Sequence, residues 1–583
     1  MNIRGFVRIR YGFRWLRSVA MMALLPALPA YGQATVPQNS AAQGLLQQAQ
    51  RQNQTKSLLP RTRDQLRPSG SAAPNLGALP TETPCFSIEQ VRFAGAHAQR
   101  LTWLSKDVQP VIGQCVGAQG LTRIADALDT HLIALGYATT RASFPPQNLA
   151  SGVLIIHLDV GTVQSVRMHT PQGQPDHAWG TWRNAFPTGA GDILNIRDLE
   201  QGIEQMDRLS SQSVHTEIVP GVQPNSSVVV IERQSATLAD RFHGGVTLDN
   251  SGNLLLGRPE LSAALSFDNP LGLNDMLSVS ANTNLENPDP AHRSQSAAMS
   301  YSIPWGYSLL SLSAQSLRFA QMVQGTTTQF LSSGSAHTQQ ARLDTTVWRT
   351  ASSKFGMFAT LAARQAHNYL DDVELVVQRR QTVSLDTGLT LTTLLPTGGR
   401  VSAQIGYRRG LASFGAQQDL PTAAEGGLTV RPRITTLSLS WDQPLRLGTA
   451  PWQYTLSLRG QTTPDTLVTE DQFIIGDRNS VRGFDGNTVL EAENGYALRN
   501  TLAHPVALLP GWNTAAYWAV DIGRVWGASA ANLSGSRLAG TAIGLKGQHG
   551  HLQFDLALAA PLHEPSGFHS QRLNLYAGAT VAF

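Results

Sequence analysis

From about residue 240 to the C-terminus, apolar and polar side chains alternate with a period of two, and turn-forming residues separate the runs. The alternation is strict in 401–408 and returns in 552–558 and 573–583. Because successive side chains of a strand point to opposite faces, this pattern predicts strands with one apolar and one polar face. Lipid outside and water inside a transmembrane barrel explains the pattern. A large soluble β-sandwich is the alternative.

The number of strands follows from the length of this region. At about 20 residues for each strand and its connection, residues 240–583 would form about 16 strands, an even number as in single-chain barrels. Beyond the N-terminal segment the most apolar stretches are short, such as 153–156 and 228–231, so we expect no transmembrane helix there. Only helices and closed barrels satisfy every backbone group in lipid. We therefore predict a mostly β protein with a transmembrane antiparallel β-barrel over 240–583.

The first 34 residues are typical of a secretory signal peptide. An Arg-rich stretch ends at Arg17, and a short apolar segment, 18–30, follows it. Two prolines interrupt that segment, which is shorter than the roughly 20 residues needed to span a bilayer. A membrane anchor is the alternative. Part of the net charge of +4 would leave with the signal, so the charge gives no argument for nucleic-acid binding.

The next 50 residues divide in two. Residues 41–50 are rich in Ala, Leu and Gln and favour a short helix. Residues 55–84 are rich in Pro, Ser, Gly and Thr, which is linker composition. A lone helix on a tether needs a docking place, so we expect residues 35–54 to plug the barrel.

Two segments, 85–160 and 161–235, look like imperfect copies of one α+β unit of about 75 residues. Each has the pattern strand, helix, helix, strand, strand. The clearest helices are expected at 121–135 and 196–209, where apolar residues recur every three or four positions. The patterns alone would fit any small α+β module.

Cys85 and Cys115 are the only cysteines. In an exported chain an even pair predicts one disulfide. A two-cysteine metal site is the alternative, but it lacks clustered His partners.

We find no motif for catalysis, for a cofactor or for a metal. There is no phosphate-binding loop, no Gly-x-Ser-x-Gly sequence and no zinc signature. His563 and His569 are separated by Pro565 and Gly567, so they cannot share one helical turn. We therefore expect a protein that is not an enzyme.

One loop carries the most specific motif of the chain. Within 476–490 the sequence runs Val481, Arg482, Gly483, Phe484, and an alternating segment, 517–526, follows. The two segments together resemble the outer-membrane superfamily that joins POTRA domains to a β-barrel. The resemblance implies that the loop folds into the barrel lumen and that Arg482 meets Asp521 on the inner wall. Ala519 and Gly523 share the face of Asp521 and leave room for the loop.

The order of all segments resembles the two-partner secretion transporters of bacterial outer membranes. The resemblance implies that 85–160 and 161–235 are POTRA domains in the periplasm. They would capture an unfolded partner exoprotein of adhesin or haemolysin type, which crosses the barrel without ATP. A capture surface is expected at the sheet edge and neighbouring helix of the second unit, around Leu199, Ile203 and Val214. A role in the core of that unit is the alternative for the helix residues.

The terminal Phe583 resembles the barrel-assembly signal of outer-membrane proteins. It implies contact with the barrel-assembly machinery and with outer-membrane lipid. Two alternatives remain open: a barrel insertase of the same superfamily, which usually has more POTRA units, and a passive porin, which needs neither POTRA units nor the Arg482 loop.

Overall fold

The computed structural model describes residues 64–68 and 76–583, apart from 236, 253, 255, 287–290, 326, 327 and 509. The expected signal peptide (1–34) and plug segment (35–54) lie outside the described residues. No helix in the part of the chain that the structure describes is long and apolar enough to cross a membrane.

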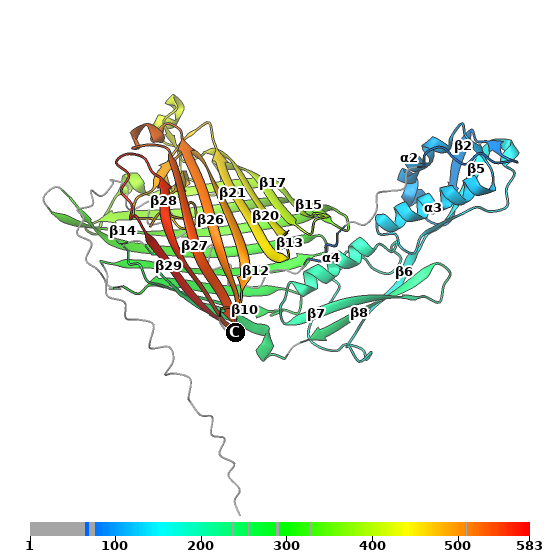
Figure 1. Ribbon diagram of the computed structural model, residues 1–583, viewed down its shortest axis with the longest axis horizontal. Coiled ribbons are helices and arrows are strands. Elements are labelled where there is room, and N and C mark those ends of the chain that lie inside the picture. The colour runs from blue at the N-terminus through cyan, green and yellow to red at the C-terminus, as the bar shows by residue number, and fades with distance from the viewer. Residues whose placement is uncertain are drawn as a thin grey trace, which may run out of the picture. The chain divides into compact units, whose positions relative to one another are not determined.

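The C-terminal part of the chain forms a closed barrel of sixteen strands, which confirms the predicted fold class (Figure 1). Neighbouring wall strands are antiparallel, and the last strand closes the wall against the first. A two-residue strand, β16 (Val373–Glu374), only extends the hairpin after β15. The wall strands are β9 (Phe242–Asp249), β10 (Glu260–Asp268), β11 (Met276–Asn284), β12 (Arg293–Trp305), β13 (Ser308–Gln324), β14 (Gln329–Arg349), β15 (Ser353–Leu370), β17 (Arg380–Leu394), β18 (Arg400–Leu411), β20 (Arg433–Leu447), β21 (Ala450–Thr462), β25 (Asn494–Val506), β26 (Asn513–Trp526), β27 (Arg537–His549), β28 (Leu552–His563) and β29 (Asn574–Ala582).

The alternation read from the sequence corresponds to the two faces of the wall. In β29, Leu575 and Val581 are exposed, whereas Asn574 and Tyr576, on either side of Leu575, are buried. The terminal Phe583 continues this strand at the barrel seam. Its N–H donates to the carbonyl of Gly244 at 3.0 Å, and its carbonyl accepts from the N–H of Gly244 at 2.9 Å. The final residue therefore takes part in closing the barrel.

The first POTRA-like unit has a three-stranded sheet with the order β2-β5-β4. Its main helix is α3 (Ala118–Ala134), which begins and ends within three residues of the predicted 121–135. After this helix, turns follow Gly136 and the chain becomes extended only in β4 (Arg141–Ser143). The other elements are β1 (Phe86–Ser87), β2 (Gln90–Ala94), α2 (Ser105–Val108), β3 (Cys115–Val116), β4 (Arg141–Ser143) and β5 (Val153–Asp159).

The second unit has a sheet with the order β6-β8-β7, built from β6 (Thr162–His169), β7 (Gln212–Pro220) and β8 (Ser226–Ser235). Its helix α4 (Ile196–Asp207) matches the predicted 196–209 closely. Between β6 and α4, residues 170–195 form turns, so the predicted first helix of this copy is wrong. Helix α4 is buried on two faces: one packs on the sheet, and the other carries Glu200, Gln201, Glu204 and Gln205.

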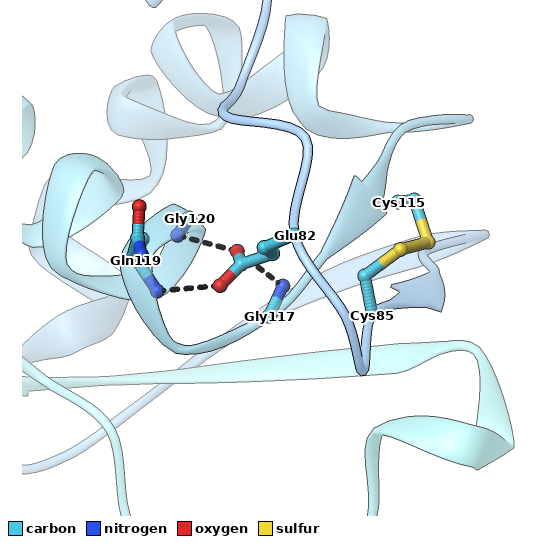
Figure 2. Close-up of a disulfide and its surroundings, with 6 residues drawn as sticks. All are labelled: Glu82, Cys85, Cys115, Gly117, Gln119 and Gly120. Carbon is cyan, nitrogen blue, oxygen red and sulfur yellow. Dashed lines mark hydrogen bonds between the residues drawn. A yellow bond between two sulfur atoms is a disulfide. The ribbon is translucent and has the colours of Figure 1, made fainter.

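The predicted disulfide joins Cys85 to Cys115, with 5.3 Å between the two Cα atoms. Beside it, the carboxylate of Glu82 accepts hydrogen bonds from the N–H groups of Gly117, Gln119 and Gly120, each at 2.8 Å (Figure 2). These N–H groups lie at the first turn of α3, where a helix has no carbonyl groups of its own to accept from them. The end of the linker is therefore fixed to the first unit by one covalent bond and one helix cap.

Candidate functional site in the barrel lumen

The loop that contains the Val481–Phe484 motif lies between two short strands, β23 (Phe473–Ile475) and β24 (Leu490–Ala492), which pair with each other. Asp477 shapes its first turn. Its Oδ1 accepts from the N–H of Asn479 at 3.1 Å and from the N–H of Ser480 at 2.7 Å. Val481 and Phe484 are fully buried, in a cluster with residues of β25, β26 and β27. The loop is therefore packed against the inner wall.

Arg482 and Asp521 form a two-pronged ion pair, as the resemblance implied. Nε donates to Oδ2 and Nη2 donates to Oδ1, both at 2.7 Å. The backbone N–H of Arg482 also donates to Oδ2, at 3.0 Å, and Nη2 donates to the carbonyl of Asn500 at 3.1 Å. Asp521 is completely buried on the inner face of β26. Paired donors on a carboxylate fix the direction of a side chain as well as its position.

Glycine makes this close approach possible. Gly483 has a φ of +119°, and a Cβ there would lie 2.6 Å from the carbonyl oxygen of Ala560 in β28. On the wall, a Cβ at Gly540 of β27 would lie 1.8 Å from the carbonyl oxygen of Arg482. Gly523 lies beside Val481 in the same way, because a Cβ at position 523 would lie 2.9 Å from Cγ2 of Val481. The small residues around Asp521 therefore form a seat for the loop.

Sequence reasoning missed part of this seat. The hydroxyl of Tyr576 accepts from the N–H of Gly483 at 3.0 Å and donates to the carbonyl of Phe484 at 2.7 Å. Asn574 Nδ2 donates to the carbonyl of Gly483 at 2.7 Å. Both side chains lie on the polar face of the last strand. That polar face is the sequence feature from which these two residues could have been found. The loop thus contacts five adjacent strands, from β25 to β29.

A second arginine, Arg499, was also missed. Its Nε lies 3.7 Å from Oδ2 of Asp521, and the two residues face each other across β25 and β26. Beside the loop, a cavity of about 340 Å³ is lined by four cations and by Tyr517, Asp555 and other polar residues. The cations are Arg478, Arg482, Arg499 and Lys546. The arrangement positions a loop in a polar lumen.

The expected capture residues lie elsewhere. Leu199, Ile203 and Val214 belong to the core of the second POTRA-like unit, where they are 2%, 9% and 2% exposed. An incoming chain cannot reach these side chains, so the expectation is wrong for contact through the apolar side chains of Leu199, Ile203 and Val214. It stays a prediction for the sheet edge, the strand β7 to which Val214 belongs. The apolar face of α4 packs on its own sheet.

Comparisons with known proteins agree with this architecture. A family model described as haemolysin secretion/activation protein ShlB/FhaC/HecB matches residues 225–547, and two POTRA-domain models match 86–161 and 162–220. The chain is 35% identical to the outer membrane transporter CdiB-2 of Burkholderia pseudomallei over 524 residues, which cover 87% of this chain and 88% of the relative. It is 33% identical to CdiB of Escherichia coli over 507 residues, 86% of this chain and 83% of the relative.

The solved structure of CdiB from Escherichia coli superposes with a TM-score of 0.78 at 29% identity, covering 94% of this chain and all of that one. The relatives are transporters rather than enzymes. In this family the barrel lies in the outer membrane and the POTRA domains lie in the periplasm. The chain therefore belongs to the haemolysin secretion/activation family ShlB/FhaC/HecB, the outer-membrane transporters of two-partner secretion.

Proposed function

We propose that this protein exports one large partner exoprotein, of the adhesin or haemolysin type, across the outer membrane. The observation that carries the proposal is the ion pair of Arg482 with Asp521, which fastens a loop inside a sixteen-strand barrel. A passive pore needs no such loop. The names of the relatives support the same direction, because they are CdiB transporters that share most of this chain's length.

The POTRA units, which we place at 85–160 and 161–235, would receive the unfolded partner in the periplasm. Because Leu199, Ile203 and Val214 are buried, the capture surface is more accessible at a sheet edge than on the apolar face of α4. In the second unit β7 is an edge strand, paired only with β8. An extended chain can add to such an edge through backbone hydrogen bonds.

The barrel, which we place at 240–583, would then conduct the extended partner. Folding of the partner outside the cell biases the transfer, so no ATP is required. Before transport, residues 35–54 would occupy the lumen as a plug. Phe583 at the seam would be read by the barrel-assembly machinery during biogenesis, and the apolar outer face would contact outer-membrane lipid.

Deleting the gene and comparing secreted proteins tests this proposal. We expect the loss of one large secreted species, restored by the wild-type gene. A general loss of outer-membrane barrels would instead indicate the alternative function, a barrel insertase. A normal set of secreted proteins together with normal outer-membrane barrels would contradict both functions and would indicate a passive pore.

A further inference from the structure

The linker is attached to the rest of the protein at an intermediate point, residues 64–68. Three of its residues contact two barrel strands, one barrel turn and helix α4, where the second POTRA unit meets the barrel. Asp64 forms ion pairs with Lys354 of β15 and with Arg400 of β18. The N–H of Gln65 donates to Oε1 of Glu204 in α4 at 2.6 Å. The N–H of Arg67 donates to the carbonyl of Ala351, in the turn between β14 and β15, at 2.8 Å.

This joint is itself a buried charge network. Arg349, at the end of β14, donates to both carboxylate oxygens of Glu204 at 2.8 Å, and its Nε lies 3.5 Å from Glu200. Lys354 Nζ lies 3.0 Å from Glu204 as well. Burial raises the pKa of Glu204, but the hydrogen bond from Arg349 and the charges of Lys354 and Arg349 lower it more, so the pKa is below its ordinary value. Glu204 is therefore an anion at neutral pH.

The two attachments of the linker differ in kind. The attachment to the first POTRA unit is covalent at Cys85, apolar at the buried Leu76, and capped by Glu82. The attachment at the joint is ionic and hydrogen-bonded, and Lys354 and Arg400 keep 20% and 41% of their side chains exposed. Because both cations reach water although Asp64 is largely buried, these ion pairs exchange more readily than fully buried ones. Of the two, only the attachment at the joint can open without unfolding a domain.

We propose that Asp64, Gln65 and Arg67 form a releasable clasp on the joint between α4 and the barrel, and that this clasp sets the length of tether available to the N-terminal segment. The inference rests on the proposed export function. With the clasp closed, residues 51–63 connect the helix-prone segment to the joint, and thirteen residues reach about 45 Å at most. With the clasp open, residues 51–75 reach about 85 Å.

Opening the clasp therefore about doubles the reach of the N-terminal segment. Export that requires the N-terminal segment to leave the barrel would require the clasp to open first.

A reversible lock tests the clasp in the full-length protein. Arg67 and Ala351 are joined by a backbone hydrogen bond, so cysteines at these two positions are close enough for a disulfide. We expect Arg67→Cys with Ala351→Cys to form that bond in outer membranes, detected as a linked pair of peptides by mass spectrometry. Oxidised cells should export at least about tenfold less partner, because the open state is no longer populated. Reductant should restore export.

The controls separate the lock from other effects. Each single cysteine variant, and the wild-type protein with reductant, should export normally, since the reductant also reaches Cys85–Cys115. Absence of the linked peptides, or normal export with the lock closed, would overturn the clasp. The export function is judged beforehand on the wild-type chain: if it secretes no partner, that function fails, whereas the linked peptides still report on the clasp.

A charge variant tests the same contact in the opposite direction. Asp64→Lys places a cation beside Lys354 and Arg400 and should release the linker, which we expect to increase chymotrypsin cleavage after Leu66, a bond that the substitution does not change, several-fold. Adding Arg400→Asp should restore part of the protection, because a new ion pair becomes possible. Equal cleavage of the wild-type protein and the Asp64→Lys variant would contradict the contact.

Discussion

The carbonyl oxygen of Arg482 lies against Gly540 so closely that a Cβ at position 540 would be 1.8 Å from it. The contact joins the backbone of the lumenal loop to the backbone of β27, and neither can move aside as a flexible side chain would. The position of the loop thus depends on a glycine in the barrel wall as well as on the ion pair.

We predict that Gly540→Ala displaces the loop and reduces export about tenfold or more, because overpacking of this kind costs about 1–3 kcal/mol. The amount of folded barrel in the outer membrane should stay normal. The measurement is the secreted partner relative to heat-modifiable barrel on a gel. Gly460→Ala in β21 is the matched control, since the nearest atom to its new Cβ is 3.7 Å away. Normal export by Gly540→Ala would show that the loop tolerates movement.

A second prediction concerns Glu82 at the start of α3. Burial raises its pKa, but the N–H groups of Gln119, Gly120 and Gly117 lower it more, so the pKa is below its ordinary value of 4.5. A carboxyl group with a lowered pKa in the folded state stabilises above its ordinary pKa, and the contribution is lost as pH falls through the lowered value. Glu82→Gln should therefore weaken the first turn of α3 at pH 7, and the difference from wild type should disappear in acid.

Hydrogen exchange of the full-length protein in detergent measures this effect. We expect the amides of Gly117, Gln119 and Gly120 to exchange several-fold faster in Glu82→Gln at pH 7. Asp126→Asn, on the exposed face of the same helix, is the control and should leave these amides unchanged. Equal protection in the wild type and in Glu82→Gln would mean that the cap contributes nothing.

The parts of the fold that follow from local periodicity could be predicted from the sequence. The barrel follows from the period of two, and α3 and α4 follow from apolar residues on one helical face. The second face of α4 could not be predicted, because Glu200 and Glu204 look like solvated charges until Arg349 of β14 is placed beside them. That contact joins residues about 145 positions apart, and no local pattern encodes it.

The residues of the lumenal site also divide into those that could be predicted from the sequence and those that could not. Arg482 and Asp521 were predicted because both lie in recognisable segments. Tyr576 and Asn574 were not, because a polar residue on an inward face of a barrel is ordinary in sequence, and only its distance from the loop distinguishes it. Leu199 and Ile203 show the opposite error, since apolar residues on a helix face are core more often than they are a binding surface.

A third prediction concerns the N-terminal segment. Deleting residues 35–54 should raise the ion conductance of the purified protein in planar bilayers while export continues, because the lumen would lose its plug. The clasp at Asp64 is retained in this variant, so the linker remains attached to the joint. A deletion within the connection between β18 and β20, where residues 412–415 are exposed, would control for general loosening of the barrel. Unchanged conductance would exclude the plug.

The fourth prediction separates a positioning ion pair from two ordinary charges. Arg482→Ala leaves Asp521 buried without its main partner, which typically costs about 3 kcal/mol or more. Arg499, 3.7 Å away, compensates in part and places the expected cost near the lower end of that range. Arg482→Lys keeps the charge but loses the fork of donors, so its export should fall between the wild type and Arg482→Ala.

Secreted partner, normalised to folded barrel in the membrane, is the readout. We expect Arg482→Ala and Asp521→Ala to reduce export sharply and to a similar extent, while the barrel still assembles through its backbone hydrogen bonds. The double variant should be little worse than either single variant, because both remove the same contact. Arg433→Ala, which breaks an ion pair with Asp465 outside the lumenal loop, is the control and should export normally. Normal export by both single variants, or defects that add fully in the double variant, would mean that Arg482 and Asp521 do not act as one contact.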